Sequence, residues 1–244
     1  MDFRPWTFDF RPWTFDLGPW TFDDEIMELV IATSNDGKFR EFVQLLDLPS
    51  LQLRSLVQFP GFPPASEQGA TFAENARSKA RHYHQLLSAA VLADDSGLEV
   101  DLLNGDPGIY SARYSGGNAS DRENVRKVLR ELHHRLGPED GNQSLPVSAE
   151  DRSYCLLSRA RFVCALSLFD SGSEQFFTQG KVEGFISSEP KGHNGFGYDP
   201  VFFVWQEGKT MAELPPSVKN RISHRSQAAR NLRSFLQDRC KSDC

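Results

Sequence analysis

The sequence lacks several features that would assign it to common classes of protein. It contains no apolar run long enough to cross a membrane, although 39% of its 244 residues are hydrophobic. No positively charged start followed by an apolar stretch marks an export signal. The few cysteines, at positions 155, 164, 240 and 244, do not have the spacing of metal ligands. We therefore predict a cytoplasmic protein with reduced thiols and no membrane partner.

Basic residues are in the minority. The chain has 27 Lys and Arg against 33 Asp and Glu, a formal net charge of −6. Residues 1–26 account for −4 of this, with two arginines against six acidic residues, so the remainder carries only −2. A chain without excess positive charge does not suit duplex DNA or RNA. We expect no nucleic-acid partner.

Residues 1–26 consist mainly of a repeated unit of seven residues. The unit reads DFRPWTF at 2–8 and 9–15, and DLGPWTF at 16–22. A proline in each copy excludes a continuous helix, and three copies are too few for a solenoid. We predict a disordered low-complexity extension outside the folded domain. A partner-docking tail of exposed Trp and Phe is the alternative.

Residues 27–244 alternate apolar strands with amphipathic helices, which predicts one α/β domain. Between a helix expected at 125–136 and a strand expected at 161–169 lies a polar segment rich in Gly, Pro and Ser, at 137–154. We predict that this insertion is a disordered surface loop, and a lid is the alternative.

The first strand, within ELVIATSNDGK at 28–38, runs into a small polar turn. Backbone N–H groups at such a turn, in front of a helix, suit an anion. The helix is predicted from the spacing of Phe39, Phe42, Val43 and Leu46. The segment lacks the G-x-x-x-x-G-K-[ST] pattern of a P-loop, so an ordinary strand-to-helix turn is the alternative.

A second helix is predicted to start at Phe72, because Thr71 and Glu74 have the spacing of a capping box. Its apolar stripe is Phe72, Ala76, Ala80, Tyr83 and Leu87. Asn75 and Lys79 share a different, polar face, and Glu67 lies on the preceding loop. For Glu74 we expect only the capping role.

The segment VLADDSGLEVDLL, at 91–103, places Asp94 and Asp95 at the end of an apolar strand. We expect a Ser-Gly turn next, and then a second strand in which Leu98, Val100 and Leu102 alternate with acidic residues. Two adjacent carboxylates repel each other unless a cation or hydrogen-bond donors compensate. Mg²⁺ prefers such oxygen ligands and usually arrives with phosphates. An ordinary Asp-Ser-Gly turn is the alternative.

Two later segments carry aromatic and basic side chains. In NGFGYDPVFF, at 194–203, glycines on both sides of Phe196 leave its ring open to stack on a planar heterocycle, next to Asp199 and a buried strand at 201–204. SVKNRISHRSQAARNLRSFL, at 217–236, begins with Lys219, His224 and Arg225 and continues as an amphipathic helix. These side chains supply hydrogen-bond donors.

Six ordered motifs from residue 27 to the C-terminus resemble the noncanonical purine nucleoside triphosphate pyrophosphatases, the inosine triphosphatase or Ham1-like family. The motifs are TSNDGK, FAENARSKA, ADDSGLEV, GIYSARYSG, NGFGYDPVFF and KNRISHRSQA. The resemblance implies a mixed sheet flanked by helices, in two lobes around a nucleotide cleft, and a homodimer. It also implies Mg²⁺-dependent hydrolysis of ITP, dITP and XTP to the nucleoside monophosphate and pyrophosphate.

The resemblance also implies a role for each matching residue. Asp95 is expected to be the catalytic proton acceptor, and Glu67 and Asp95 are expected to bind the metal. The residues expected to bind the substrate are Thr33, Ser34, Asn35, Asp36, Gly37, Lys38, Lys79, Ser96, Phe196, Gly197, Tyr198, Asp199, Lys219, His224 and Arg225. Hypoxanthine and xanthine present an acceptor oxygen at position 6, to which His224 or Arg225 can donate, whereas adenine presents an amino group there.

Two residues depart from the family pattern at the phosphate turn. Ser34 replaces the usual glycine, and Asp36 adds a negative charge, so weaker phosphate binding is expected. Two other functions remain open. One is a pyrophosphatase for modified pyrimidine triphosphates, and the other is a nucleotide-binding regulatory module without turnover. Asp95, Glu67 and Lys219 together argue against the second.

Overall fold

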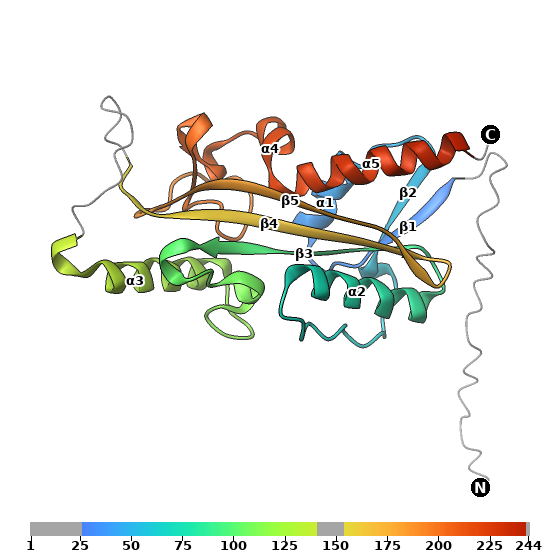
Figure 1. Ribbon diagram of the computed structural model, residues 1–244, viewed down its shortest axis with the longest axis horizontal. Helices are drawn as coiled ribbons and strands as arrows, with labels where there is room; N and C mark the ends of the chain where they lie inside the picture. Colours follow the sequence, from blue (N-terminus) through green and yellow to red (C-terminus); the bar gives the residue numbers. More distant parts are fainter. Residues whose placement is uncertain (1–25, 141–153, 243–244) are drawn as a thin grey trace, which may run out of the picture.

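The computed structural model describes residues 26–140 and 154–242. The predicted extension at 1–26, apart from Ile26, and most of the predicted insertion at 137–154 lie outside these ranges. The described chain forms a mixed seven-stranded sheet with helices on both faces (Figure 1), which confirms the α/β prediction. None of the helices in the described ranges has both the length and the apolar character of a membrane span.

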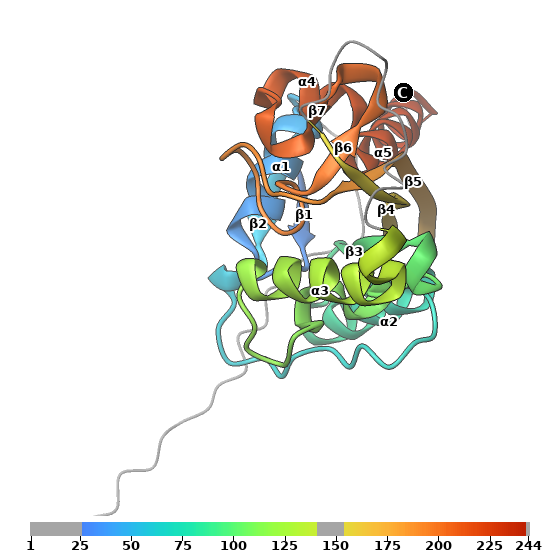
Figure 2. The same cartoon turned by 90° about the vertical axis from the view of Figure 1, so that its left-hand side faces the viewer.

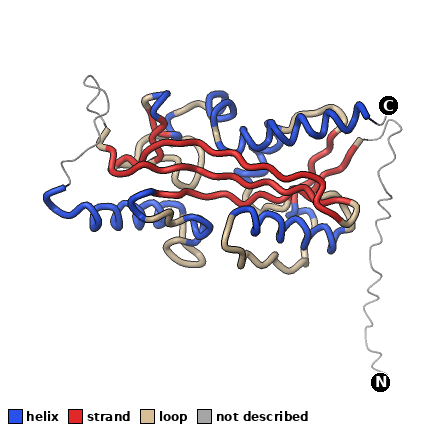
Figure 3. Tube along the Cα trace, in the orientation of Figure 1, coloured by secondary structure: helices blue, strands red, loops and turns tan. Residues whose placement is uncertain are grey.

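The strands lie in the order β2-β1-β3-β4-β5-β6-β7. Their bounds are β1 (Met27–Ile31), β2 (Leu51–Ser55), β3 (Val91–Val100), β4 (Leu156–Asp170), β5 (Ser173–Ser187), β6 (Phe202–Val204) and β7 (Lys209–Thr210). The first three strands of this order are parallel and the remaining pairs are antiparallel. The long strands β3, β4 and β5 run side by side through the molecule (Figure 3).

Five α-helices and five short 3₁₀ helices are present in the described residues. The α-helices are α1 (Asp36–Leu45), α2 (Phe72–Leu87), α3 (Asp121–Asp140), α4 (Pro216–Ile222) and α5 (His224–Ser242). The 3₁₀ helices are η1 (Leu56–Gln58), η2 (Asp101–Leu103), η3 (Gly108–Arg113), η4 (Trp205–Glu207) and η5 (Met211–Glu213). Helices α1, α4 and α5 lie on one side of the sheet, and α2 and α3 lie on the other (Figure 2).

The alternation of side chains along β1 explains why helices cover both faces. Leu29 and Ile31 pack with residues of α1 and α5, whereas Val30 and Ala32 pack with residues of α2. Successive residues of a strand point to opposite faces, so an unbroken apolar run serves a sheet that is covered on both sides.

The predicted start of α2 is confirmed by its cap, whereas α1 begins at Asp36, inside the turn that was predicted from Thr33 to Lys38. The Asn35 side chain accepts a hydrogen bond from the Lys38 N–H, and that of Thr71 accepts one from the Glu74 N–H. Glu74 in turn accepts one from the Ala70 N–H, so its capping role is confirmed. The predicted α2 stripe is buried except for Leu87, which is partly buried. In α1, Phe42 is buried as predicted, but Val43 is 46% exposed.

The predicted break after Asp94 and Asp95 is wrong. Strand β3 continues without a turn, because it pairs with β4 from Val91↔Phe169 to Val100↔Ala160. Asp94 and Asp95 therefore lie inside a paired strand and not at its end. Leu102 belongs to η2 and is 41% exposed, so it does not continue the strand.

The C-terminal amphipathic segment is divided into two helices. Ser223 is extended, with φ −64° and ψ 155°, and it separates α4 from α5. Lys219 consequently lies on α4, while His224 and Arg225 form the first turn of α5. The break between the helices therefore brings three predicted binding residues together, one from α4 and two from α5.

Candidate active site

The site lies along an open edge of β3. Strand β1 pairs with β3 only as far as Ile31↔Leu92, and Leu98 is held on the same side by the Ser111 hydroxyl. Between these points, no strand of the described ranges pairs with that edge. Because strand side chains alternate, Asp94 and Ser96 face α1 and α5, whereas Asp95 and Gly97 face α2. The two adjacent carboxylates are thus separated by the sheet.

On the α1 and α5 face, Asp94 is surrounded by donors. Lys38 Nζ lies 2.7 Å from its Oδ2, and Ser96 Oγ and Cys164 Sγ donate to its oxygens at 3.2 and 3.1 Å. Burial alone would raise the pKa of this carboxyl, but Lys38 and Arg225 hold it well below its usual value. Asp94 is therefore a permanent anion that orients the basic side chains around it.

Arg225 connects this anion with the rest of the face. It forms an ion pair with Glu41 of α1, donates to Ser96 Oγ at 3.0 Å and is 2% exposed. Its guanidinium carbon lies 5.6 Å from the centre of the Phe196 ring. A buried guanidinium held by a carboxylate and a hydroxyl is positioned rigidly beside the aromatic ring.

His224 is buried and its ring stacks on Phe162, with centroids 4.9 Å apart. Burial and the Arg225 charge lower the pKa of His224 well below its usual value, so the imidazole is neutral. Its Nδ1 has no hydrogen-bond partner in the described structure. This atom is therefore available to a ligand.

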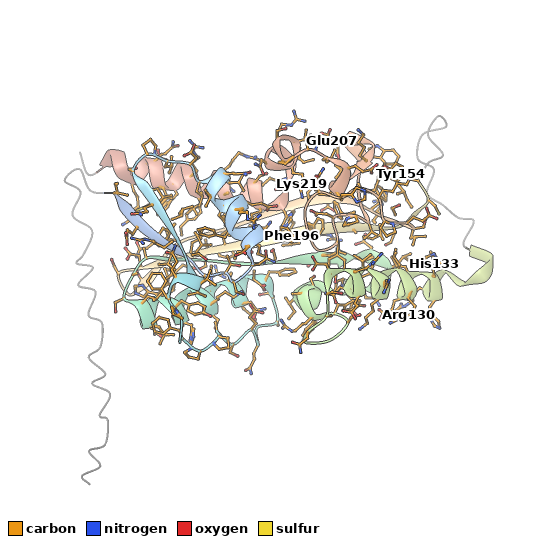
Figure 4. All side chains as sticks on the ribbon, turned by 180° about the vertical axis from the view of Figure 1, so that it is seen from behind. Arg130, His133, Tyr154, Phe196, Glu207 and Lys219 are labelled. Carbon is orange, nitrogen blue, oxygen red and sulfur yellow. The ribbon has the colours of Figure 1, made fainter. Side chains whose placement is uncertain are left out.

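The loop that carries Phe196 is held against α1 and α4. A Cβ at Gly37 would lie 2.9 Å from Phe196 Cδ1, so the ring rests directly on the glycine at the start of α1. Asp199 accepts from the Phe196 N–H at 3.3 Å and pairs with Lys219 Nζ at 2.5 Å. Figure 4 shows Phe196 beside α1, with Lys219 nearby.

These residues enclose one side of a cavity. Many of the predicted binding residues line it, and so do several that were not predicted. The predicted ones are Asn35, Lys38, Ser96, Phe196, Gly197, Tyr198, Asp199, Lys219, His224 and Arg225. The others include Glu41, Ser111, Asp121, Phe162 and Ser223.

The α2 face holds three other predicted residues, Glu67, Lys79 and Asp95. Lys79 Nζ lies 2.5 Å from Glu67 Oε1 and donates to the Asp94 carbonyl at 3.3 Å. Arg113 of η3 approaches the other Glu67 oxygen at 3.1 Å. Burial opposes ionisation of Glu67, but Lys79 and Arg113 outweigh it and lower its pKa.

Asp95 differs from these paired groups. It is 7% exposed, and its Oδ2 has no hydrogen-bond partner in the described structure. Burial raises the pKa of Asp95 to about 6, against the opposing effect of Lys79. Its neighbour Asn75 is fully buried, accepts from the Gly69 N–H at 2.8 Å and has an unpartnered Nδ2.

Orphaned polar atoms concentrate at this site. Six buried side-chain atoms in the described ranges have no partner, and four of them belong to Asn75, Asp95, His224 and Arg225. Buried polar groups are normally satisfied, so each exception calls for an explanation. His224 and Arg225 line the cavity on one face of β3, whereas Asn75 and Asp95 lie on the α2 face.

The turn that the sequence predicts to bind phosphate includes Asn35, the N-cap of α1. Thr33 is buried, and its Oγ1 accepts from the Asn35 N–H at 3.1 Å. Ser34 and Asp36 are exposed, with Asp36 in the first turn of α1. The structure thus brings Lys38 into the site, while the two departures from the family pattern face outward.

Three residues of the site were not predicted from the sequence: Glu41, Arg113 and Asp121. Glu41 lies three residues after Lys38 on the same helix, which is a usable signal. Arg113 lies inside the GIYSARYSG motif, to which no role was given. Asp121 contacts the Phe196 loop across 76 residues of sequence, for which no local signal exists.

Comparisons with known proteins show which family the chain resembles. The family model described as the Ham1 family matches residues 29–235. The dITP/XTP pyrophosphatase of Bacillus licheniformis is 44% identical over 209 residues, covering 86% of this chain and 97% of that protein. The protein of the same name from Geobacillus kaustophilus is 45% identical over 205 residues, covering 84% and 92%.

Solved structures show the same fold. The HAM1 protein of Coxiella burnetii aligns with a TM-score of 0.71 at 38% identity, covering 87% of this chain and 99% of the other. The Staphylococcus aureus Ham1 protein aligns with a TM-score of 0.70 at 40% identity, again covering 87% and 99%.

Proposed function

Because the chain belongs to the Ham1 family, we infer that it hydrolyses noncanonical purine nucleoside triphosphates, namely ITP, dITP and XTP. The products are the nucleoside monophosphate and pyrophosphate. The enzyme is thus a hydrolase of acid anhydrides that removes deaminated purines from the nucleotide pool. The observation that best supports this function is the set of orphaned polar atoms on both sides of the open edge of β3.

We propose that Asp95 accepts the proton of the attacking water. It is buried, its Oδ2 is unpartnered, and its pKa of about 6 lies close to neutral pH. A general base works best when its pKa is near the working pH. Asp94 does not suit this role, because Lys38 and Arg225 hold its proton affinity too low.

A divalent cation fits the α2 face. Asp95 offers an unpartnered oxygen, and Glu67 lies on the same side of the sheet, where Lys79 contacts Glu67 and acts on the charge of Asp95. In the ranges 26–140 and 154–242, no three His, Cys, Asp or Glu side chains come close enough to form a complete metal site. Two carboxylates completed by water and phosphate oxygens are typical of Mg²⁺, which we propose as the metal. When bound, it supplies positive charge to the phosphates and polarises them.

The charges of the site explain the need for such a cation. Four basic side chains are already paired with acids: Lys38 with Asp94, Lys79 with Glu67, Lys219 with Asp199 and Arg225 with Glu41. A triphosphate carries about four negative charges, which these balanced pairs do not neutralise by themselves.

We propose that the base binds between Phe196 and the first turn of α5. The Phe196 ring stacks on the purine, and Arg225 donates to the oxygen at position 6. Neutral His224 adds its orphaned Nδ1. Adenine lacks the oxygen at position 6 and would leave these buried donors unpaired, which disfavours it. The homodimer and the cytoplasmic location remain predictions.

The experiment that tests this function is a substrate panel. Pyrophosphate and orthophosphate release would be measured from dITP, XTP, dGTP, dATP and dUTP, each with Mg²⁺. We expect pyrophosphate from dITP and XTP at much higher kcat/KM than from the others. Preferential hydrolysis of dUTP would instead favour a pyrimidine enzyme, and no release from any substrate would favour a regulatory module.

A further inference from the structure

Asp121, the first residue of α3, has no role in the reaction described so far. Its Oδ2 accepts a hydrogen bond of 2.7 Å from the backbone N–H of Gly197. Both residues line the cavity. Helix α3 lies on the opposite side of the sheet from α1 and α4 (Figure 2), so this bond joins the Phe196 loop to the far wall of the cavity.

The bond fixes a peptide group next to the aromatic ring. The Phe196 N–H donates to Asp199 at 3.3 Å, and the following N–H, that of Gly197, donates to Asp121. The two peptide groups that flank Phe196 are therefore both held by carboxylates. The loop needs this restraint, because Gly195 and Gly197 have φ values of +87° and +63°, and glycine leaves the backbone many alternatives.

We propose that Asp121 is a positioning residue for nucleotide binding, which holds the Phe196 ring in the orientation that stacks on the purine. The proposal rests on the proposed function. Asp121 acts through the loop and does not touch the reacting phosphates. A ring that is already held in place loses less conformational freedom when the base binds. Asp121 therefore contributes to the affinity for the nucleotide. The free energy of stacking is the same in the ground state and in the transition state. Loss of the stacking contact therefore raises KM and leaves kcat unchanged.

The competing explanation is that Asp121 only stabilises the start of α3, since a carboxylate is favourable near a helix N-terminus. Glu123 provides a matched control. It lies in the same turn, and its carboxylate accepts from the Ser120 N–H at 2.7 Å, so it stabilises the helix start without contacting the loop. Glu123→Ala removes this acceptor and should affect the stability of α3 and not the KM.

The kinetic test compares Asp121→Ala, Asp121→Asn, Glu123→Ala and Phe196→Ala, together with the Asp121→Ala/Phe196→Ala double variant. We expect Asp121→Ala to raise KM for ITP and XTP by roughly 3–10-fold, the range of one hydrogen bond, with kcat within about twofold. Asp121→Asn keeps an acceptor oxygen and should restore most of the affinity. In the Phe196→Ala background, the loss of Asp121 should have no further effect, because both changes remove the same stacking contact.

A second readout does not depend on turnover. Hydrogen exchange at the Gly197 amide should be slow in the wild type and in Asp121→Asn, and fast in Asp121→Ala. An unchanged KM in Asp121→Ala, or additive losses in the double variant, would overturn the proposal, as would equal Gly197 exchange in all variants. Absence of pyrophosphate release from the wild type would instead overturn the proposed function, and the Gly197 exchange would still decide whether Asp121 holds the loop.

Discussion

Asp94 and Asp95 are neighbours in the chain with opposite properties. Asp94 is held by Lys38 and by the Ser96 hydroxyl, whereas one oxygen of Asp95 has no partner in the described structure. The pKa of Asp94 is lowered and that of Asp95 is raised to about 6. The cause is the alternation of strand side chains, which places Asp94 among cations on the α1 and α5 face and Asp95 against α2 on the other face.

A first prediction concerns turnover. Asp95→Asn keeps the shape of the side chain and removes the base and a metal charge, so kcat should fall by roughly 10² or more. Steady-state pyrophosphate release from dITP measures this, with circular dichroism as the folding control. A kcat within a few-fold of the wild type would move the catalytic role away from Asp95, to Glu67 on the same face of the sheet.

A second prediction is that the two aspartates have opposite effects on stability. The folded pKa of Asp95 lies above its usual 3.8, so its ionised form costs stability above about pH 6, and the cost vanishes below about pH 4. In metal-free protein, Asp95→Asn should therefore increase the free energy of unfolding at pH 8 by roughly 2–3 kcal/mol and leave it unchanged near pH 4.

Asp94→Asn is the matched comparison. The pKa of Asp94 is lowered, so its ionised form stabilises the fold above its usual pKa, and this contribution is lost only as the pH falls through the folded value. The variant should be destabilised at pH 8. Urea unfolding of both variants in EDTA gives the values, and changes of the same sign would contradict the assignment of the two environments.

At the scale of elements, the site depends on how α5 meets the sheet. Gly180 of β5 lies directly under the first turn of α5, where a Cβ would fall on the carbonyl oxygen of His224 and lie 2.8 Å from Ala228 N. This close approach lets α5 start at the sheet, with His224 and Arg225 turned toward the cavity. A glycine in a strand often marks such an approach.

A third prediction follows from this contact. Gly180→Ala should push the start of α5 away, lower the free energy of unfolding by roughly 1–3 kcal/mol and raise KM for ITP. Gly117→Ala is the control, because a Cβ at Gly117 would have nothing within 4 Å. Thermal unfolding and steady-state kinetics of both variants test the prediction. A Gly180→Ala protein that behaves like Gly117→Ala would show that α5 adjusts freely.

At the scale of the molecule, the basic side chains around the site are balanced by acidic ones. Each basic residue that is predicted to contact the substrate is already paired with an acid. Four negative charges added to this balanced site would be repelled by Glu67, Asp94 and Asp95.

A fourth prediction is that removal of the metal weakens the binding of ITP far more than the binding of IMP. With EDTA, the Kd for ITP should rise by at least about tenfold and pyrophosphate release should stop, since the divalent cation no longer offsets the phosphate charge. IMP lacks the β- and γ-phosphates and should bind nearly equally with and without the metal. Calorimetry with IMP and with an ITP analogue that cannot be cleaved between the α and β phosphates measures this, and equal affinity for the analogue in EDTA would contradict the charge argument.

A fifth prediction concerns residues 1–26. Deletion of this segment should leave the melting temperature, the kinetics and the oligomeric state unchanged, because the first strand begins only at Met27. Light scattering would report the oligomeric state and thermal unfolding the stability. A lower melting temperature or a changed mass would show that the aromatic repeats bind the domain or its partner subunit.

The sequence alone determined the features that depend on nearby residues. The cap at Thr71, most of the stripe of α2 and the family motifs all lie within short segments. Capping boxes span four residues and helical periodicity spans a few turns, so both can be read without the fold. The expected break in β3 failed because Asp-Ser-Gly also occurs in turns, and only pairing with β4 keeps the strand intact.

The tertiary structure decided which groups meet. Asp94 and Asp95 are adjacent in sequence, yet the sheet separates them, whereas Glu41 and Arg225 meet across 184 residues and Asp121 and Gly197 across 76. Partner choice over such distances depends on how strands pair and helices pack, and no local pattern encodes it. The same packing excludes water and raises the pKa of Asp95, because burial disfavours a charge that the solvent would otherwise stabilise.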